Sequence, residues 1–295
     1  MVTGAAVAPE RGWLRRTDIL PRVVAAAAFL ILFRSPVEGT LRLWLTDPDA
    51  GHGLLLAPLA FFLAWRQGLA GDRRAQPTLG AALLLGAVLL RYVSGLATEL
   101  FSMRISAVGA LFALVVFAWG LRQLARWWLP ATLLVLAIPL PELLIGSLAL
   151  PLQFRASRMG AALLEWRNVP VELAGNVIRL PGHTLFVTEA CSGLRSLSAL
   201  LALGFLIGGL WLRTVWARAA LVLAAVPIAM LLNSVRIFLT GFAVYFIDPA
   251  LGRGVMHYTE GWAMFVAAFA ALGVTGLALA WGERLLRRRP ARVTA

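Results

Sequence analysis

The chain has 295 residues, of which 60% are hydrophobic and only 14% are charged. Soluble domains are nearer half apolar and a quarter charged, so the composition excludes a water-soluble globule, a disordered chain and a disulfide-stapled module. The net charge is +13 and every basic residue is an arginine. Because the arginines stand at the ends of apolar blocks, they are typical of membrane-protein loops and do not favour a nucleic-acid partner.

The apolar blocks predict an all-α polytopic membrane protein with about eight transmembrane helices, since a bilayer core needs roughly 20 residues per helix. The first block is as short as a signal-peptide core, but no small-residue cleavage site follows it, so we expect an uncleaved helix. The predicted spans are 20–34, 52–65, 78–97, 102–120, 127–147, 191–211, 217–247 and 259–281. The predicted regions are an N-terminal segment at 1–19, a transmembrane domain at 20–282 and a basic tail at 283–295.

With these spans, most of the arginines fall on one side of the membrane. The positive-inside rule makes that side cytoplasmic and places both termini there. One long connection, about 149–190, then lies on the outer side of the membrane, which is the periplasm if the protein sits in a bacterial inner membrane. Within it, residues 152–166 mix apolar and basic residues at helical spacing, which predicts a helix lying in the interface. Residues 171–187 alternate β-branched residues with turn signals, which predicts extended segments joined by turns.

Four arginines fall inside predicted spans, where a central arginine costs about 2.5–3.5 kcal/mol on insertion scales. Arg91 and Arg104 lie near the outer ends of their spans and can reach the interface. Arg195 and Arg236 cannot be explained so simply. These two positions are therefore candidates for function.

Arg195 follows the only cysteine, Cys191, by four residues, so both share one face of a helix. The polar residues before Leu194 suit a helix N-terminus, whose dipole and nearby positive charge favour a thiolate. A buried, inert cysteine with Arg195 bound to carbonyl groups is the structural alternative.

Asn233 and Arg236 share a face of the next span, three residues apart, and His257 stands at the outer start of the last span. Helix–helix hydrogen bonding is the structural alternative for Arg236, and an ordinary interfacial histidine is the alternative for His257. Of the other histidines, His52 opens the second span and His183 follows Pro-Gly as a turn residue.

Together the cysteine, the arginine and the histidine map to the outer halves of three consecutive spans. Cys with His is the minimal pair for nucleophilic acyl transfer, and a guanidinium can hold a developing oxyanion or a substrate carboxylate. One cysteine and three scattered histidines offer no usual metal-ligand spacing, so we expect neither a metal nor a cofactor.

The sequence resembles the exosortase/archaeosortase family of multi-pass membrane cysteine transpeptidases over roughly residues 20–282. The resemblance rests on three blocks, which are Glu189-Ala190-Cys191-Ser192-Gly193-Leu194-Arg195-Ser196, Asn233-x-x-Arg236-Ile237 after Pro227, and His257 with Glu260-Gly261-Trp262.

The resemblance implies that Cys191, Arg236 and His257 are catalytic. From their positions on the same helices, we expect Arg195 to support the thiolate and Asn233 to support Arg236. It implies that the partners are exported proteins with a C-terminal sorting signal, which comprises a short motif (often Pro-Glu-Pro), a transmembrane helix and a basic tail. Cleavage would proceed through a thioester, with transfer to a lipid or glycan amine acceptor, in the context of exopolysaccharide production.

Two alternatives stay open at this point. A transporter or scaffold subunit of an exopolysaccharide-export system would use the buried arginines without needing Cys191. An intramembrane thiol protease would hydrolyse the thioester without an acceptor.

Overall fold

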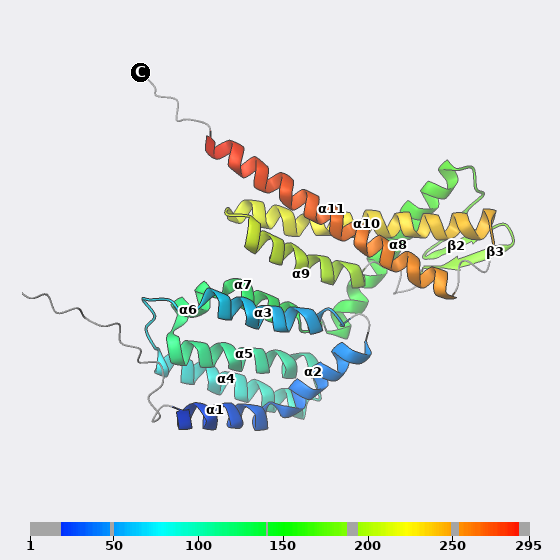
Figure 1. Ribbon diagram of the computed structural model, residues 1–295. Coiled ribbons are helices and arrows are strands. Elements are labelled where there is room, and N and C mark those ends of the chain that lie inside the picture. The colour runs from blue at the N-terminus through cyan, green and yellow to red at the C-terminus, as the bar shows by residue number, and fades with distance from the viewer. Residues whose placement is uncertain (1–18, 48–49, 140, 188–193, 249–253, 289–295) are drawn as a thin grey trace, which may run out of the picture.

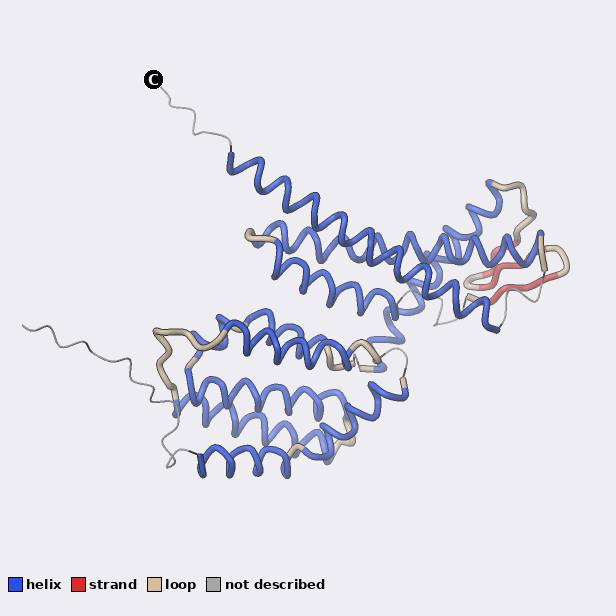
Figure 2. The backbone as a smooth tube through the Cα atoms, viewed as in Figure 1, coloured by secondary structure: helices blue, strands red, loops and turns tan. Residues whose placement is uncertain are grey.

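The computed structural model describes residues 19–47, 50–139, 141–187, 194–248 and 254–288, and at some positions it describes the backbone alone. The regular structure of the described chain is helical apart from one small sheet, which lies at the opposite end of the molecule from the end of the last helix (Figures 1 and 2). The helices are α1 (Ile19–Leu32), α2 (Arg34–Thr46), α3 (Gly53–Gln67), α4 (Pro77–Leu96), α5 (Leu100–Trp119), α6 (Leu121–Arg126), α7 (Trp128–Leu136), α8 (Glu142–Trp166), α9 (Leu194–Trp211), α10 (Val215–Phe246) and α11 (Gly254–Arg288). The strands are β1 (Glu172–Ala174), β2 (Val177–Leu180) and β3 (His183–Phe186).

Four of the described helices are long and apolar enough to cross a membrane. They are Pro77–Leu96, Leu100–Trp119, Val215–Phe246 and the Gly261–Arg287 part of α11. Two shorter apolar helices are Gly53–Gln67 and Leu197–Trp211. A multi-pass membrane protein is therefore the right class, while the total of eight spans stays a prediction.

The predicted span at 127–147 is wrong, because the chain forms two helices there. α7 ends at Leu136, and α8 begins at Glu142 after Pro141, whose backbone is extended. Two prolines at 139 and 141 remove backbone donors and disfavour helical geometry in the residues before them. The chain therefore breaks at this point and starts a new helix.

The new helix also corrects the start of the predicted periplasmic connection. The predicted helix at 152–166 exists, but it is the second half of α8, which runs on through Pro151. α2, at 34–46, was not expected as an element at all, because its polar and charged residues give no apolar span. At the C-terminal end, α11 continues to Arg288 and takes in the first residues of the predicted basic tail.

α4 and α5 form a tight antiparallel hairpin. Gly80 lies directly against the backbone of Phe117, where a Cβ atom would have no room. Glu99 ends the short connection between the helices and caps α5, since its carboxylate accepts hydrogen bonds from the N–H groups of Phe101 at 3.0 Å and Ser102 at 2.6 Å. Hydrogen bonds from Ser102 and Phe101, together with the charge of Arg104, hold the pKa of Glu99 below its usual value.

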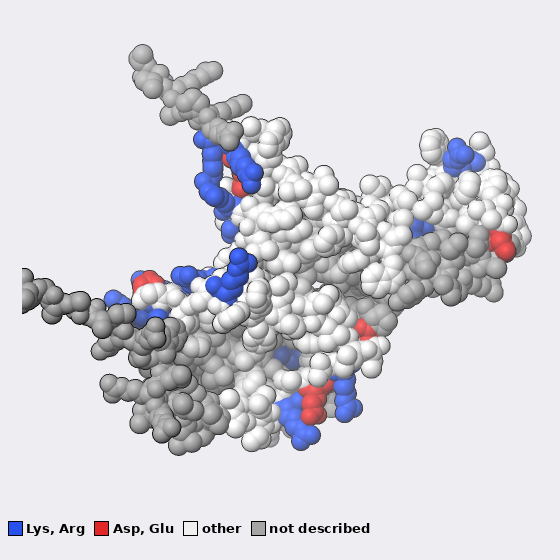
Figure 3. Space-filling view, viewed as in Figure 1, with Lys and Arg blue, Asp and Glu red and all other residues white. Residues whose placement is uncertain are grey.

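Several arginine-bearing connections meet at one end of the molecule. Glu283 of α11 accepts hydrogen bonds from the backbone N–H groups of Arg213 and Thr214, which connect α9 to α10. The guanidinium carbon of Arg218 lies 4.9 Å from the ring centroid of Trp128, at the start of α7. Figure 3 shows basic side chains gathered at this end, with smaller groups elsewhere. The predicted clustering of arginines is thus present, although the side of the membrane that this end faces stays a prediction.

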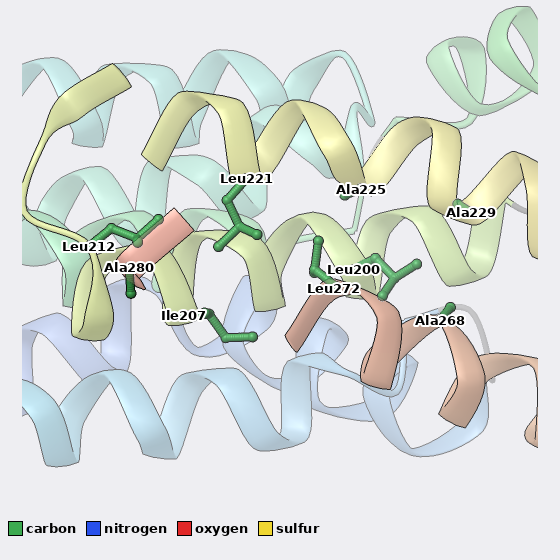
Figure 4. Packing of buried hydrophobic residues seen from close by; sticks show 9 residues of the cluster. All are labelled: Leu200, Ile207, Leu212, Leu221, Ala225, Ala229, Ala268, Leu272 and Ala280. Carbon is green, nitrogen blue, oxygen red and sulfur yellow. The ribbon is translucent and has the colours of Figure 1, made fainter. Parts of the chain in front are cut away.

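Two hydrophobic cores follow one another along α10. The first joins α9, α10 and α11 through side chains that include Leu200, Leu221 and Leu272, all fully buried (Figure 4). The second joins the far half of α10 to α8 and the sheet, through residues that include Leu164 and Ile178. α10 therefore belongs to the helix bundle in its first part and to the sheet-bearing end in its last part.

The sheet has the antiparallel order β1-β2-β3, which confirms the extended segments predicted within 171–187. Gly182, with φ at +76°, follows Pro181 in the turn that joins β2 to β3. His183 was expected in the turn, but it is the first residue of β3 and lies opposite Leu180. The Pro-Gly pair alone completes the two-residue turn, so the histidine begins the strand.

Candidate functional site

The structure describes some of the predicted site residues fully and others only by their place in the chain. Arg236 and Asn233 lie on α10 with their side chains described. Position 195 is the second residue of α9 and position 257 the fourth of α11, but their side chains lie outside the description. Cys191 lies in 188–193, outside the described residues.

The guanidinium of Arg236 lies against the backbone of α11 at Gly261. A Cβ atom built on Gly261 would lie 3.4 Å from one terminal nitrogen of Arg236, 3.5 Å from its guanidinium carbon and 3.6 Å from the other nitrogen. All three atoms are nearly equidistant, so the flat group faces this point of α11. Position 257 is four residues earlier on the same helix, one turn away on the same face and about 6 Å along the axis. Arg236 and position 257 thus belong to one α10–α11 contact.

Asn233 stands on the same face of α10 as Arg236 and is only 6% exposed. A buried amide in an apolar helix is costly unless it is hydrogen-bonded, so it marks a polar spot in an otherwise apolar helix. One turn further on, the hydroxyl of Thr240 donates to the backbone carbonyl of Arg236 at 3.0 Å. Asn233 and Arg236 thus stand three residues apart on one helix, and the roles predicted for them stay predictions.

The packing of α9 on α10 fixes how the start of α9 lies relative to these residues. Gly208 lies beside Arg218, and Gly204 lies beside Val222; Cβ atoms built on the two glycines come within 3.6 and 3.4 Å of the facing Cα atoms. The contacts step by four residues in opposite directions, as antiparallel helices require. Continuing this register to the first residue of α9 places it level with residue 232, next to Asn233.

The packing of α11 on α10 gives an independent register. Gly276 lies beside Leu221, with a built Cβ atom 3.5 Å from that side chain, and Gly261 lies beside Arg236. These two contacts are fifteen residues apart on both helices, so the register holds along the bundle. The two registers consequently place three parts of the molecule at about the same height along the helix bundle, which we call one level. These parts are the start of α9, the Asn233–Arg236 turn of α10 and Gly261 of α11.

This level is also where the two cores of α10 meet. Ala229 is the last fully buried member of the bundle core along α10, and Ile237 is the first member of the sheet-side core. A built Cβ atom on Gly241 lies 2.8 Å from Leu164 of α8 and 3.3 Å from Leu185 of β3. The polar turn at 233–236 therefore lies between the apolar bundle and the small sheet.

The other two histidines have contacts of their own. His52 immediately precedes α3, and its Nε2 lies 3.3 Å from the backbone carbonyl of Leu136 at the end of α7. His183 lies on β3 as described above. Among the described residues, no group of three His, Cys, Asp or Glu side chains is arranged to hold a metal ion.

Gly261 and α8 are the parts of the site that the sequence did not identify as structural supports. Gly261 stands in the motif that follows His257, but nothing in its spacing announces contact with an arginine on another helix. Gly160 of α8 has a comparable role behind α10, because a Cβ atom there would come within 2.5 Å of the Ile237 side chain. Both positions gain meaning only when the neighbouring helix is known.

A comparison with protein families finds one match, a model described as transmembrane exosortase, over residues 44–274. This range covers more than three quarters of the chain and contains every predicted site residue. Comparisons with curated proteins and with solved structures give no match.

Proposed function

The chain belongs to the transmembrane exosortase family, and from this premise we propose that it is a membrane-embedded cysteine transpeptidase. Its substrates would be exported proteins with a C-terminal sorting signal, cleaved at the periplasmic face of the inner membrane. The observation that carries the proposal is the shared level of the start of α9, Arg236 and Gly261. Cys191 precedes α9 by three residues and His257 precedes Gly261 by one turn.

In the proposed reaction, the Cys191 thiolate attacks the scissile carbonyl carbon and forms a tetrahedral intermediate with a negatively charged oxygen. The Arg236 guanidinium donates hydrogen bonds to that oxygen. His257 protonates the departing amine as the C–N bond breaks, which leaves the substrate as a thioester on Cys191. An amine of a lipid or glycan acceptor then attacks the thioester and releases the thiol; water in its place would give hydrolysis.

The two supporting residues act through the two principal ones. Arg195, one turn after Cys191, would favour the thiolate by its charge. Asn233, buried on the face that carries Arg236, would orient the guanidinium. A motif just outside the substrate's transmembrane helix meets these groups at the level where α10 leaves the bundle core.

The proposal is tested by co-expressing a protein that ends in a sorting signal and following its size by gel mobility. We expect the wild-type chain to shorten it and Cys191→Ala to leave it at full length while still inserting in the membrane. Hydroxylamine should release the shortened product from wild-type enzyme, because it cleaves thioesters. If Cys191→Ala processes the substrate normally, the transpeptidase proposal fails and a transporter or scaffold role replaces it.

Arg236→Lys tests the role of the guanidinium. Lysine keeps the charge but cannot present two parallel donors, and loss of an oxyanion donor typically costs a rate factor of about 100–1,000. Arg218→Lys is the matched control, since Arg218 lies on the same helix at the arginine-rich end. We expect processing to collapse only in the first variant; wild-type turnover of Arg236→Lys would contradict the oxyanion role.

A further inference from the structure

Among the described residues, the third strand of the sheet has one open edge. In the order β1-β2-β3, β3 pairs with β2 on one side only. Leu180 and His183 flank the two-residue turn, and Val187 donates to the carbonyl of Asn176 at 2.9 Å. Because hydrogen-bonded pairs alternate in an antiparallel ladder, Thr184 and Phe186 are the residues that direct their N–H and C=O groups away from β2.

These outward groups are not taken up by the described chain. No hydrogen bond from the backbone of Thr184 or Phe186 to another described residue is present outside the sheet. Both side chains are exposed, Phe186 by 67%. A strand with unpaired edge groups and an exposed aromatic residue is a template for another strand. The edge can therefore accept an extended peptide backbone as a further strand.

β3 is held against α10 by its third residue. Leu185, between the two outward residues, packs on α10 at Gly241, five residues after Arg236 and about 7.5 Å further along the helix axis. The sheet-side core that includes Leu185 begins at Ile237, next to Arg236. A peptide on the open edge would therefore lie about one to two turns of α10 away from the guanidinium.

Chain continuity links the edge to the cysteine as well. β3 ends at Phe186, five residues before Cys191, a distance that an extended chain spans in at most about 17 Å. A four-residue strand also suits a short recognition segment better than a long one. The position of β3, its length and its outward backbone groups all match a short extended peptide that must reach Cys191.

We propose that the open edge of β3 binds the extended segment preceding the substrate's transmembrane helix, as an added fourth strand. This inference rests on the proposed function and says how the same site holds its substrate. Main-chain hydrogen bonds from Thr184 and Phe186 would supply affinity that does not depend on sequence. Exposed side chains at the edge, Phe186 foremost, would supply selectivity.

Disulfide cross-linking tests the pairing directly. Cys191 is the only cysteine, so Cys191→Ala gives a cysteine-free chain that also keeps its substrate uncleaved. Into this background we would introduce Thr184→Cys or Phe186→Cys, with single cysteines scanned through the substrate segment. Glu172→Cys, exposed on the opposite edge strand β1, is the matched control.

Pairing predicts cross-links that alternate along the substrate with a period of two, several-fold stronger at alternate positions. The favoured substrate position should move by two residues between Thr184→Cys and Phe186→Cys. Cross-links without this period, or equal cross-linking at Glu172→Cys, would overturn the inference. So would disulfide-linked dimers of the chain itself, because the edge would then pair with a second copy.

A backbone variant gives a second measurement. Thr184→Pro removes one outward N–H without touching the β2–β3 hydrogen bonds, and Thr184→Val keeps that N–H together with a β-branched side chain. We expect Thr184→Pro to raise the KM for the sorting-signal protein several-fold and Thr184→Val to leave it unchanged. Equal KM values would contradict the inference, whereas unprocessed substrate with wild-type enzyme would contradict the proposed function itself.

Discussion

Arg236 lies at the boundary between the two hydrophobic cores that follow one another along α10. On one side α10 is packed into the apolar bundle, and on the other it is packed against α8 and the sheet. α10 has 32 residues, about 48 Å at 1.5 Å per residue, which exceeds the roughly 30 Å hydrocarbon core. Arg236 is ten residues from its end, so the helix can place the guanidinium near one surface of the membrane, where a charge costs less than at the centre.

The contact of the Arg236 guanidinium with Gly261 leads to a prediction. A Cβ atom there lies at ordinary contact distance, 3.4 Å or more from Arg236, so Gly261→Ala should process a sorting-signal protein nearly as well as wild type. The larger, branched side chain in Gly261→Val should displace the guanidinium and lower processing at least tenfold. The measurement is the processing rate of membrane-inserted variants.

Gly273→Val is the control for a valine on the same helix, because nothing lies within 4 Å of a Cβ atom at Gly273. Equal processing by Gly261→Val and Gly273→Val would show that the position of Arg236 does not depend on this contact.

At the residue scale, the sequence predicted partners on one helix but not across helices. Asn233 and Arg236 share a face because three residues make most of a turn, and the spacing shows this directly. The contact of Arg236 with Gly261 depends on the α10–α11 register, which is set by packing along both helices. A glycine also carries no side-chain chemistry, so its sequence position gives no sign of what it accommodates.

Among the elements, α8 supports the site from the side of Ile237, the residue after Arg236. It packs against the far half of α10, and Gly160 lies so close that a Cβ atom would approach Ile237 to 2.5 Å at Cγ2 and 2.9 Å at Cβ. Ile237 is branched at Cβ and has little freedom to move aside. α8 therefore holds the part of α10 that begins immediately after Arg236.

We predict that Gly160→Ala destabilises the protein and impairs processing together. Overpacking of this kind typically costs about 1–3 kcal/mol, which should lower the melting temperature in detergent, and the displaced α10 should slow cleavage of the sorting signal. Gly86→Ala on α4 is the control, since nothing lies within 4 Å of its Cβ position and alanine favours a helix. A Gly160→Ala variant with wild-type melting and turnover would refute the role assigned to α8.

The elements themselves were predictable where apolar length alone decides. α4, α5 and α10 differ from their predicted spans by no more than two residues at either end. The start of α8 was predicted as part of the same span as α7, because hydropathy alone does not reveal the helix break at the two prolines between Leu136 and Glu142. α2 was missed for the opposite reason, since a helix with few apolar residues resembles a loop when only spans are sought.

The whole molecule has two chemically different ends. One end joins arginine-bearing connections, as in the hydrogen bonds of Glu283 to Arg213 and Thr214. The other carries the sheet, the last turns of α10 and the first turns of α11 (Figure 1). If the arginine-rich end faces the cytoplasm, the sheet and the candidate site face the compartment into which sorting-signal proteins are exported.

This orientation gives a prediction that does not require a substrate. In the cysteine-free Cys191→Ala background, Gly71→Cys places a thiol in the exposed connection after α3, where a built Cβ atom meets nothing within 4 Å. Phe186→Cys places one on the exposed edge of the sheet. A membrane-impermeant maleimide should label position 186 in cells whose outer membrane alone is permeable, and position 71 only after the inner membrane is opened.

Two other labelling patterns are possible, and each would contradict a different part of the predicted orientation. The reverse pattern would mean that the arginines do not set the orientation, and the candidate site would then open into the cytoplasm, away from exported substrates. Labelling of both thiols from the same side would mean that the chain crosses the membrane an even number of times between positions 71 and 186. The helices α4 to α8 lie between these two positions, so the number of them that cross the membrane would then be even. Only labelling on opposite sides, with position 186 outside, is compatible with cleavage of an exported protein at the level of Arg236.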